Sequence, residues 1–318
     1  MRFAMTCSDR YLGVFEGLLR AGWSPEKLFL VPVQGPVDLN RHVLARATKL
    51  GIEVQISKMT DRDLADLGAR GCEALVVASY NWRIGDWRPH LKYAVNFHCS
   101  PLPTGRGPYP TIQAILEERD TWGVTCHKLE RNFDAGDVLA QELFPLSKDE
   151  CQESLDLKVQ MAAGRLTTQI TGRFVELWTG AKAQGEGSYW KRPTDADRVI
   201  DFARPVEAIL RHVRAFGSAE STANVSGATV SVRRANGWTE AHSHTPGKVV
   251  HVSSSQHAIV VAAADGYVAL MDWQLRQQAV LGASARSLAQ TPAGDAVARF
   301  TASAASTEAR TGQPGPTR

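Results

Sequence analysis

Short apolar runs and amphipathic stretches alternate along residues 1–80 of the chain. The apolar runs predict buried strands, and the stretches between them, in which apolar residues recur at helical spacing, predict helices. This β-α-β-α-β-α-β order indicates a parallel sheet with right-handed crossovers and helices on both faces, whose ligands bind at the carboxyl ends of the strands. The strands are expected at residues 2–7, 28–33, 53–57 and 73–79, and the helices at 11–19, at 39–50 and from 60 onward.

Residues 94–178 predict a second run of strands and helices. Ser147 and Glu150 fit a capping box, which predicts the start of a long helix that reaches about Trp178. Before that helix, a polar loop from Glu130 to Asp137 separates two strands. The other expected elements are a strand at 94–100, a Pro/Gly-rich loop at 100–110, a short helix at 111–118, and strands at 123–129 and 138–146.

The last third of the chain has a different pattern. A connector with little periodicity leads to a helix at 205–214, after which short strands and turn signals predict a small antiparallel barrel or sandwich. We therefore expect one domain at residues 1–190, a linker at 191–204, and a small β-rich domain at 205–280. Residues 286–318, rich in Ala, Thr, Ser, Gly and Pro, predict a disordered tail. The expected strands are 228–234, 248–253, 257–264 and 267–273.

Composition narrows the class of protein. No stretch approaches eighteen uncharged apolar residues, and the start of the chain lacks the apolar segment of a signal peptide, so a cytoplasmic protein with no membrane partner is expected. The five cysteines are single and widely spaced, which favours buried thiols over disulfides or a metal site. No Gly-x-Gly-x-x-Gly motif follows the first strand and no phosphate-binding P-loop occurs, so neither a nicotinamide cofactor nor a P-loop nucleotide is expected.

The net charge of +3 is unevenly distributed. Residues 286–318 carry +2, residues 198–280 carry +2, and residues 1–197 are left with −1. No region is therefore basic enough to predict a nucleic-acid surface.

Polar side chains concentrate where the strand at 94–100 ends. Asn96, His98 and Ser100 alternate, so they share one face of an extended strand. Asp134 lies in the loop between the next two strands. An amide donor, an imidazole and a carboxylate suit acyl transfer to an amine, because the amide can stabilise an oxyanion and the imidazole, oriented by the carboxylate, can move a proton.

The surrounding string, VNFHCSPLPTGRGPYP and then WGVTCHKLERNFDAGDVLAQE, resembles the folate-dependent formyltransferase family. Members carry Asn-x-His-x-Ser, then Leu-Pro, Arg-Gly and Pro, later Gly-Val-Thr, and then Asp-x-Gly-Asp before Leu-x-Gln. The resemblance spans roughly residues 1–275 and includes a linker, Tyr189 to Pro205, seen in methionyl-tRNA and amino-sugar formyltransferases. It implies an α/β fold: a Rossmann-like parallel-sheet formyltransferase domain followed by a small β-rich, OB-like barrel domain.

The resemblance implies that Asn96, His98 and Asp134 are the catalytic triad and that 10-formyltetrahydrofolate is the formyl donor. It also implies that the folate pocket is built from the loop after the fourth strand, Ser79 to Trp87, and from the loop ahead of Asp134. The side chains expected to contact the folate are Arg83, Ile84, Trp87, Glu130, Phe133 and Asp137.

Two residues depart from the usual family pattern His-Pro-Ser-Leu-Leu-Pro, since Cys99 stands in place of Pro and Pro101 in place of Leu. Pro101 fixes φ and removes an N–H, so the path of the acceptor loop is expected to differ. Cys99 is not expected to be a nucleophile, because the residue after His98 points to the opposite face of the strand. His127 is expected to be structural or to face the acceptor, and the linker aromatics Tyr189 and Trp190 to pack.

Three functions fit these features. We expect a small-molecule primary amine or hydroxylamine, either a nucleotide-linked amino sugar or an ornithine-type precursor. Methionyl-tRNA formylation is the alternative, although the exit of the second strand, residues 33–40, has no basic residue and the C-terminal domain is only +2. A 10-formyltetrahydrofolate hydrolase or a folate-binding protein is the third. Homodimer formation is left open.

Overall fold

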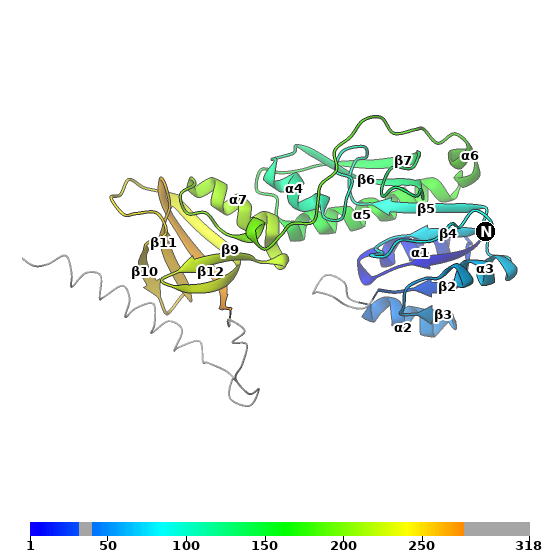
Figure 1. Ribbon diagram of the computed structural model, residues 1–318, viewed down its shortest axis with the longest axis horizontal. Helices are drawn as coiled ribbons and strands as arrows, with labels where there is room; N and C mark the ends of the chain where they lie inside the picture. The colour runs from blue at the N-terminus through cyan, green and yellow to red at the C-terminus, as the bar shows by residue number, and fades with distance from the viewer. Residues whose placement is uncertain (32–39, 277–318) are drawn as a thin grey trace, which may run out of the picture. The chain divides into compact units, whose positions relative to one another are not determined.

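A computed structural model describes residues 1–31 and 40–276 of the chain (Figure 1). The chain divides into two compact units, Met1–Arg192 and a second that begins at Pro193. The end of the second predicted strand, the exit segment 33–39 and the predicted tail at 286–318 lie outside the described residues. In the part of the chain that is described, no helix is both long and apolar enough to span a bilayer.

The first unit is built on a seven-stranded sheet with the order β3-β2-β1-β4-β5-β6-β7. The five strands from β3 to β5 are parallel, and β6 runs antiparallel to both of its neighbours. The predicted parallel-sheet α/β class is confirmed. The strands are β1 (Arg2–Thr6), β2 (Ser24–Phe29), β3 (Glu53–Gln55), β4 (Ala74–Val77), β5 (Tyr93–His98), β6 (Thr121–Lys128) and β7 (Val138–Pro145).

Helices occupy the predicted connections of this sheet (Figure 1). The start of α3 is fixed by a local signal in the sequence, since Thr60 and Asp63 cap the helix reciprocally. The Thr60 side chain accepts from the Asp63 amide at 3.3 Å, while the Asp63 carboxylate accepts from the Thr60 amide at 2.8 Å. The helices of this unit are α1 (Leu12–Arg20), α2 (Arg41–Leu50), α3 (Asp61–Ala69), α4 (Pro110–Leu116), α5 (Gln152–Thr171) and α6 (Phe174–Thr179), and a short 3-10 turn, η1 (Asp9–Tyr11), precedes α1.

The strand order places β1 between β2 and β4, so the chain builds the sheet outward in two directions from β1. Ligands of such sheets bind where this reversal occurs, at the carboxyl ends of the strands. The residues that follow β1, β4 and β5 therefore border the expected ligand site.

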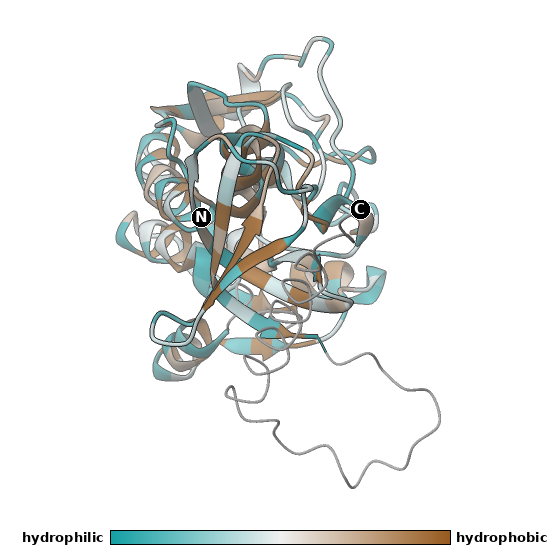
Figure 2. Cartoon of the chain, turned by 90° about the vertical axis from the view of Figure 1, so that its left-hand side faces the viewer, coloured by the Kyte–Doolittle hydropathy of each residue, from teal (hydrophilic) through white to brown (hydrophobic). Residues whose placement is uncertain are grey.

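The apolar runs in the central strands reflect burial on both faces of the sheet. On β1, Phe3 packs against Phe15 and Trp23, with ring centroids 6.2 and 6.0 Å away, whereas its neighbour Ala4 belongs to a different core cluster that includes Leu64. Figure 2 shows hydrophobic residues concentrated along the strands. The core thus holds the strand ends that carry the polar side chains in place.

Two local predictions are wrong. The long helix begins at Gln152 rather than at Ser147, because Cys151 is its N-cap and the Cys151 amide donates to Ser154 Oγ at 3.2 Å. The Glu150 carboxylate does accept from the Ser147 amide at 3.2 Å, but as part of a turn ahead of the helix. The helix also stops at Thr171, and α6 starts anew at Phe174.

Other differences concern element ends. The second strand begins at Ser24 and ends at Phe29, earlier than the predicted 28–33. The polar segment Ser221–Val225 forms a strand that the hydrophobic pattern did not predict, because side chains such as Ser221 and Thr222 are polar yet buried.

The second unit is a five-stranded antiparallel sheet with the order β10-β11-β12-β9-β8. One helix, α7 (Val206–Phe216), packs its apolar face on this sheet through Val206, Ile209 and Val213, which join the core of the unit. The predicted β-rich class is confirmed. The strands are β8 (Ser221–Val225), β9 (Ala228–Thr239), β10 (Val249–Ser253), β11 (Ala258–Ala262) and β12 (Gly266–Leu275).

Candidate active site

The structure brings Asn96, His98 and Asp134 together at the carboxyl end of β5. Asn96 and His98 are two residues apart on the strand, so their side chains leave the same face. Asp134 reaches them from the loop between β6 and β7. Its Oδ1 atom lies 3.3 Å from Asn96 Nδ2 and 3.3 Å from His98 Nδ1. The three predicted catalytic side chains therefore meet at Asp134 Oδ1, through a hydrogen bond from Asn96 and a close contact with His98.

The amide of Asn96 faces two acceptors. Its Nδ2 atom donates to Asp134 Oδ1 at 3.3 Å and to the His127 ring at Nε2, 3.1 Å away. Both N–H donors are therefore engaged, which fixes the orientation of the amide. Such a pre-oriented donor is suited to stabilising an oxyanion.

His98 is buried, with 7% of its surface exposed, and lies between two acceptors. Its Nε2–H donates to the Gly105 carbonyl at 2.9 Å, and Nδ1 faces the Asp134 carboxylate. Burial lowers the pKa of His98 below its usual value and outweighs the attraction to Asp134, so the resting ring is neutral. A proton that reaches His98 enters at Nδ1, where the carboxylate receives the new N–H.

Asp134 is held as an anion. Burial alone would raise its pKa, but attraction to His98, the polar contact with the His127 ring and the Gly107 amide together lower it to about 2. The Gly107 N–H donates to Oδ2 at 3.0 Å. Gly107 has φ 110°, and a Cβ there would lie 2.1 Å from the Trp190 carbonyl oxygen. Only glycine can therefore supply this amide donor.

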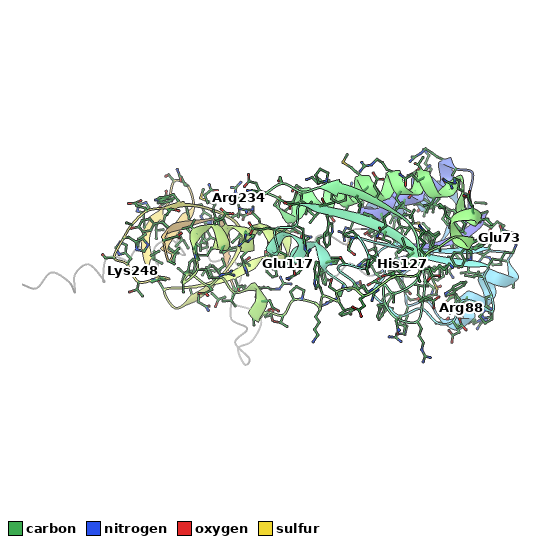
Figure 3. The ribbon with its side chains drawn as sticks, turned by 90° about the horizontal axis from the view of Figure 1, so that it is seen from above. Glu73, Arg88, Glu117, His127, Arg234 and Lys248 are labelled. Carbon is green, nitrogen blue, oxygen red and sulfur yellow. The ribbon has the colours of Figure 1, made fainter. Side chains whose placement is uncertain are left out.

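His127 belongs to the same group, which the sequence did not reveal. It is 1% exposed and lies in the interior of the first unit (Figure 3). Its Nδ1–H donates to the Lys128 carbonyl at 2.8 Å, which leaves Nε2 as the acceptor for Asn96. The register of β5 and β6 places Asn96 directly opposite His127. The signal that could have found it is the alternation of Thr125 and His127 on a strand next to Asn96 and His98.

Residues 184–188, just before the domain boundary, form hydrogen bonds with the loops of the site. The sequence contained no sign of these contacts. Gln184 Nε2 donates to the backbone carbonyls of Asp134 and Gly136 at 2.9 and 2.7 Å. Its Oε1 accepts from Arg106 Nε and Nη2 at 3.1 and 2.9 Å. Ser188 Oγ accepts from the Gly105 amide at 2.8 Å. This segment therefore ties the loop after β5 to the loop that carries Asp134.

The predicted folate contacts lie on two neighbouring loops. Arg83 lies over the ring of Phe133, 5.2 Å from its centroid, and half of Phe133 is exposed. This pair offers an exposed aromatic and cationic surface. Ile84 packs partly against the core of the unit. Trp87 is buried, with Nε1 donating to the Leu129 carbonyl at 3.2 Å, so its side chain serves packing.

The remaining two predicted contacts are acidic side chains in ion pairs. Glu130 pairs with Arg88 at 2.5 Å, and Asp137 pairs with Lys128 at 3.1 Å. Both carboxylates are more than 40% exposed and lie beside the loop that holds Asp134. In the structure the partners of both carboxylates are cations of the protein itself.

Cys99 and Trp190 have packing roles. Cys99 is 8% exposed, and burial raises the pKa of its thiol. The thiolate that a nucleophile needs is therefore disfavoured. Trp190 stacks on Trp122 with ring centroids 5.7 Å apart and planes at 6°. Tyr189 is 56% exposed.

A metal site is not found in the part of the chain that is described. Within residues 1–31 and 40–276, no cluster of three or more His, Cys, Asp or Glu side chains is arranged to hold a metal ion.

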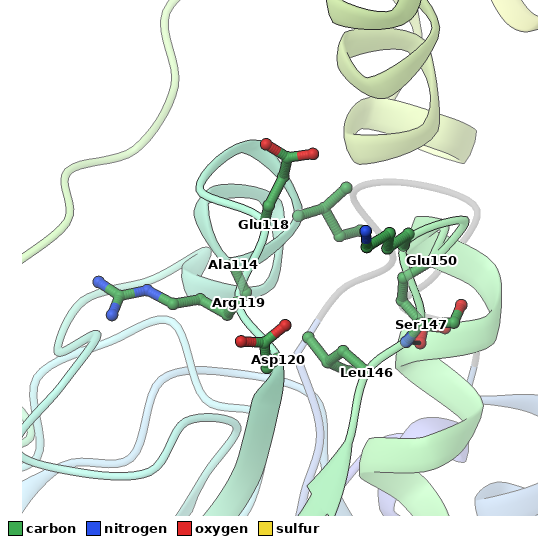
Figure 4. Close-up of a pocket in the computed structure, with 9 residues that line it drawn as sticks. Ala114, Glu118, Arg119, Asp120, Leu146, Ser147 and Glu150 are labelled. Atoms are coloured by element: carbon green, nitrogen blue, oxygen red, sulfur yellow. Dashed lines mark hydrogen bonds between the residues drawn. The ribbon is translucent and has the colours of Figure 1, made fainter.

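A cavity of about 250 Å³ lies elsewhere in the first unit, between the end of α4 and the turn that precedes α5 (Figure 4). None of Asn96, His98 or Asp134 lines it. Its wall mixes acidic and basic side chains, and the buried Glu150 is held by Lys158 at 2.5 Å. It is lined by Ala114, Ile115, Glu118, Arg119, Asp120, Leu146, Ser147, Lys148 and Glu150.

Two family descriptions match the chain in tandem. "Formyl transferase" matches residues 57–171 and "Formyl transferase, C-terminal domain" matches residues 193–287. Among curated relatives, the methionyl-tRNA formyltransferase of Janthinobacterium sp. (strain Marseille) is 26% identical over 259 residues, which are 77% of this chain and 75% of that protein. The methionyl-tRNA formyltransferase of Sulfurimonas denitrificans is 31% identical over 54% of this chain and 57% of that protein.

Solved structures share the fold. HypX from Aquifex aeolicus in complex with tetrahydrofolic acid has a TM-score of 0.63 and 20% identity over 87% of this chain, which spans 44% of HypX. An N-formyltransferase from Helicobacter canadensis, in complex with folinic acid and dTDP-3-aminofucose, has a TM-score of 0.58 and 15% identity over 85% of this chain and 98% of that one. Both units of the chain therefore have counterparts of known architecture.

Proposed function

The chain belongs to the formyltransferase family, and from this premise we propose that it transfers the formyl group of 10-formyltetrahydrofolate to the primary amine or hydroxylamine of a small molecule. The observation that carries the proposal is the convergence of Asn96, His98 and Asp134 at the carboxyl end of β5, where Asp134 Oδ1 lies 3.3 Å from both Asn96 Nδ2 and His98 Nδ1. The first unit is then the catalytic domain, and the acceptor is a nucleotide-linked amino sugar or an ornithine-type precursor.

Asn96 stabilises charge in this mechanism. As the amine attacks the formyl carbon, negative charge develops on the formyl oxygen. An Asn96 N–H that now points at Asp134 or His127 turns to that oxygen, and the low-polarity surroundings strengthen the new hydrogen bond.

His98 and Asp134 take up one proton. The attacking amine must lose a proton as its C–N bond forms, and neutral His98 receives it at Nδ1. The resulting imidazolium has both N–H bonds satisfied, one by Gly105 and one by ionised Asp134. His98 then returns the proton to the departing nitrogen as the old C–N bond breaks, so no net proton is gained or lost by the protein.

The donor, when bound, supplies an activated formyl group and a nitrogen that accepts the returning proton. The residues proposed to hold it are Arg83, Ile84, Glu130, Phe133 and Asp137, with Trp87 supporting their loop from beneath. The chemistry of this set fits, because the exposed Phe133 ring suits a flat heteroaromatic ring and Arg83 suits a carboxylate tail.

Charge supports a small acceptor. Residues 1–197 carry −1 and residues 198–280 only +2, whereas tRNA binding scales with the number of phosphates that Lys and Arg neutralise. Methionyl-tRNA formylation remains the second candidate, and the observation that favours it is the group of curated relatives that carry this name. A folate-binding protein would not need the proton-accepting His98, whereas a hydrolase would use it to activate water, so turnover with and without an amine separates a hydrolase from the proposed transferase.

The proposal is tested by measuring tetrahydrofolate release from 10-formyltetrahydrofolate with a panel of nucleotide-linked amino sugars, N-hydroxyornithine, ornithine and methionyl initiator tRNA. We expect release and a formylated product with a small amine. Turnover with the tRNA alone would replace this function by the second candidate, and release without any acceptor would indicate a hydrolase.

A further inference from the structure

The turn after β1 contains a buried ion pair next to the candidate active site. Arg10 Nε lies 2.5 Å from Asp156 Oδ1, and the two side chains are only 20% and 14% exposed. Arg10 belongs to η1, at the point where the sheet order reverses, and Asp156 lies in the second turn of α5. The pair thus joins the edge of the sheet that binds ligands to the start of the longest helix.

Unpartnered polar atoms gather around this pair. Within the described residues, buried side-chain atoms without a hydrogen-bond partner include Arg10 Nε and Asp156 Oδ1 of the pair itself, and three oxygens on the segments that adjoin it: Ser8 Oγ after β1, Ser100 Oγ after β5 and Gln152 Oε1 at the start of α5. Buried polar atoms in folded proteins are nearly always paired. A group of exceptions at one place therefore indicates a polar ligand or water.

Contacts connect these residues. Gln152 and Asp156 are one turn apart on the same face of α5. Tyr11, the neighbour of Arg10, lies against the Cys99 thiol, which adjoins Ser100. Ser8 and Ser100 are fully buried. Ser8 and Ser100 thus adjoin Arg10 through the turn after β1 and through Cys99, and Gln152 adjoins it through Asp156.

The guanidinium is held by one edge only. Asp156 contacts Nε, and Gln160 Nε2 donates to Asp156 Oδ2 at 2.7 Å, which holds the carboxylate. Among the described residues, Nη1 and Nη2 of Arg10 have no hydrogen-bond partner. A guanidinium fixed in this way presents two parallel N–H donors, the geometry that binds carboxylate or phosphate bidentately.

We propose that Arg10, with Ser8, Ser100 and Gln152, forms a subsite that binds an oxyanion of the acceptor, a carboxylate or a phosphate, and so orients its amine toward His98. The inference rests on the proposed formyl transfer. Asp156 is a positioning residue, because it acts by holding Arg10.

The proposed Arg10 subsite is close enough to His98 for one small acceptor to reach both. Only β4 separates β1 from β5. The ends of these two strands are therefore two strand spacings, about 10 Å, apart. The pKa of His98 is lowered first by burial and then also by the Arg10 charge, so the guanidinium is within electrostatic reach of the ring. An acceptor that carries its amine and its oxyanion on one small scaffold can occupy both sites at once.

The direct test is calorimetric titration of the whole protein with pyrophosphate and, separately, with succinate. Binding of either anion to the wild type that weakens at least tenfold in Arg10→Met supports the subsite. If only pyrophosphate binding depends on Arg10, the subsite recognises a phosphate of the acceptor. If only succinate binding does, it recognises a carboxylate. The control is Arg165→Met, which removes an exposed α5 arginine paired with Glu142 and is expected to bind like the wild type.

Arg10→Lys is included because Arg10→Met could fail to fold. It keeps the positive charge but lacks the two parallel N–H donors of the guanidinium. We expect it to fold as the wild type and to bind the anion several-fold more weakly. Equal binding by the wild type, Arg10→Lys and Arg10→Met, or no binding of either anion, would overturn the subsite. Since no formyl transfer is measured, these outcomes are independent of the proposed function, which fails separately if no amine is formylated.

Discussion

Gln184 Nε2 donates to the backbone carbonyl of Asp134 at 2.9 Å, across fifty positions of sequence. Asp134 has φ 53°. A non-glycine residue rarely adopts this left-handed conformation unless its surroundings hold it. The same amide group also donates to Gly136 at 2.7 Å. Gln184 therefore holds the proposed catalytic carboxylate at the orientation in which it meets Asn96 and His98.

Replacement of Gln184 by Met keeps the length of the side chain but removes its hydrogen bonds. We expect kcat to fall roughly tenfold with little change in the KM for the acceptor, because a carboxylate displaced by a fraction of an ångström loses transition-state stabilisation. Steady-state kinetics at saturating donor measure this split. Gln169→Met, which removes an exposed amide from Glu142, is the control and should leave kcat unchanged.

A second variant separates the two partners of Gln184. Gln184→Glu can still accept from Arg106 but cannot donate to the carbonyls of Asp134 and Gly136. We expect it to be as impaired as the Met variant. Full kcat in Gln184→Glu would show that the contact with Arg106 alone matters.

His127 is expected to hold the amide of Asn96. His127→Phe fills similar volume but offers no acceptor at Nε2, so the Asn96 amide loses one of its two anchors. We expect kcat to fall roughly tenfold while the fold persists. His127→Gln, which restores a polar side chain, should recover part of the rate. Unaltered kinetics in His127→Phe would remove His127 from the site.

Asp134 makes stability depend on acidic pH. Its folded pKa of about 2 lies below its ordinary value of 3.8, so the unfolded state binds protons more readily in this range. The carboxylate contributes about 2 kcal/mol of stability above roughly pH 4, and this contribution is lost as the pH falls toward about 2. Denaturant unfolding at several pH values should show that Asp134→Asn lacks this part of the acid dependence. Parallel curves for both proteins would contradict the ionised state.

His98 is a base rather than an acid, but like Asp134 it makes the folded protein less stable as the pH falls. Burial lowers its pKa in the folded protein, so protonation favours the unfolded state as the pH falls below 6.5. The catalysed rate should likewise fall at acidic pH, where His98 no longer accepts a proton. Titration of the His98 ring by NMR should give a midpoint below 6.5, and Asp134→Asn should lower the midpoint further because it removes the attraction to the carboxylate.

Part of this architecture was predictable from the sequence, because it depends on residues that are close together along the chain. The alternation of Asn96 and His98 on an apolar strand fixes a shared face, and apolar runs buried on both sides give the parallel strands. The position of Asp134 in the loop between the next two strands allowed it to converge with them, and the family resemblance implied that it does. Thr60 and Asp63 marked the start of α3 through a contact between near neighbours.

The rest depended on contacts that local patterns do not contain. His127 meets Asn96 only through the register of β5 and β6, and Gln184 lies in a connector without periodicity. The Arg10–Asp156 pair joins residues far apart in the chain. β8 was missed because its buried Ser and Thr side chains look like a loop in a hydrophobic pattern.

Formyl transfer by Asn96, His98 and Asp134 is tested most directly by the amount of formylated amine formed per folded protein. Mass spectrometry measures this product for the wild type, His98→Ala and Asp134→Asn, each supplied with 10-formyltetrahydrofolate and the small-amine panel. We expect product with the wild type and a loss of at least a thousandfold, about 4 kcal/mol, in each variant, while circular dichroism shows that both remain folded. Wild-type rates in either folded variant would contradict this expectation.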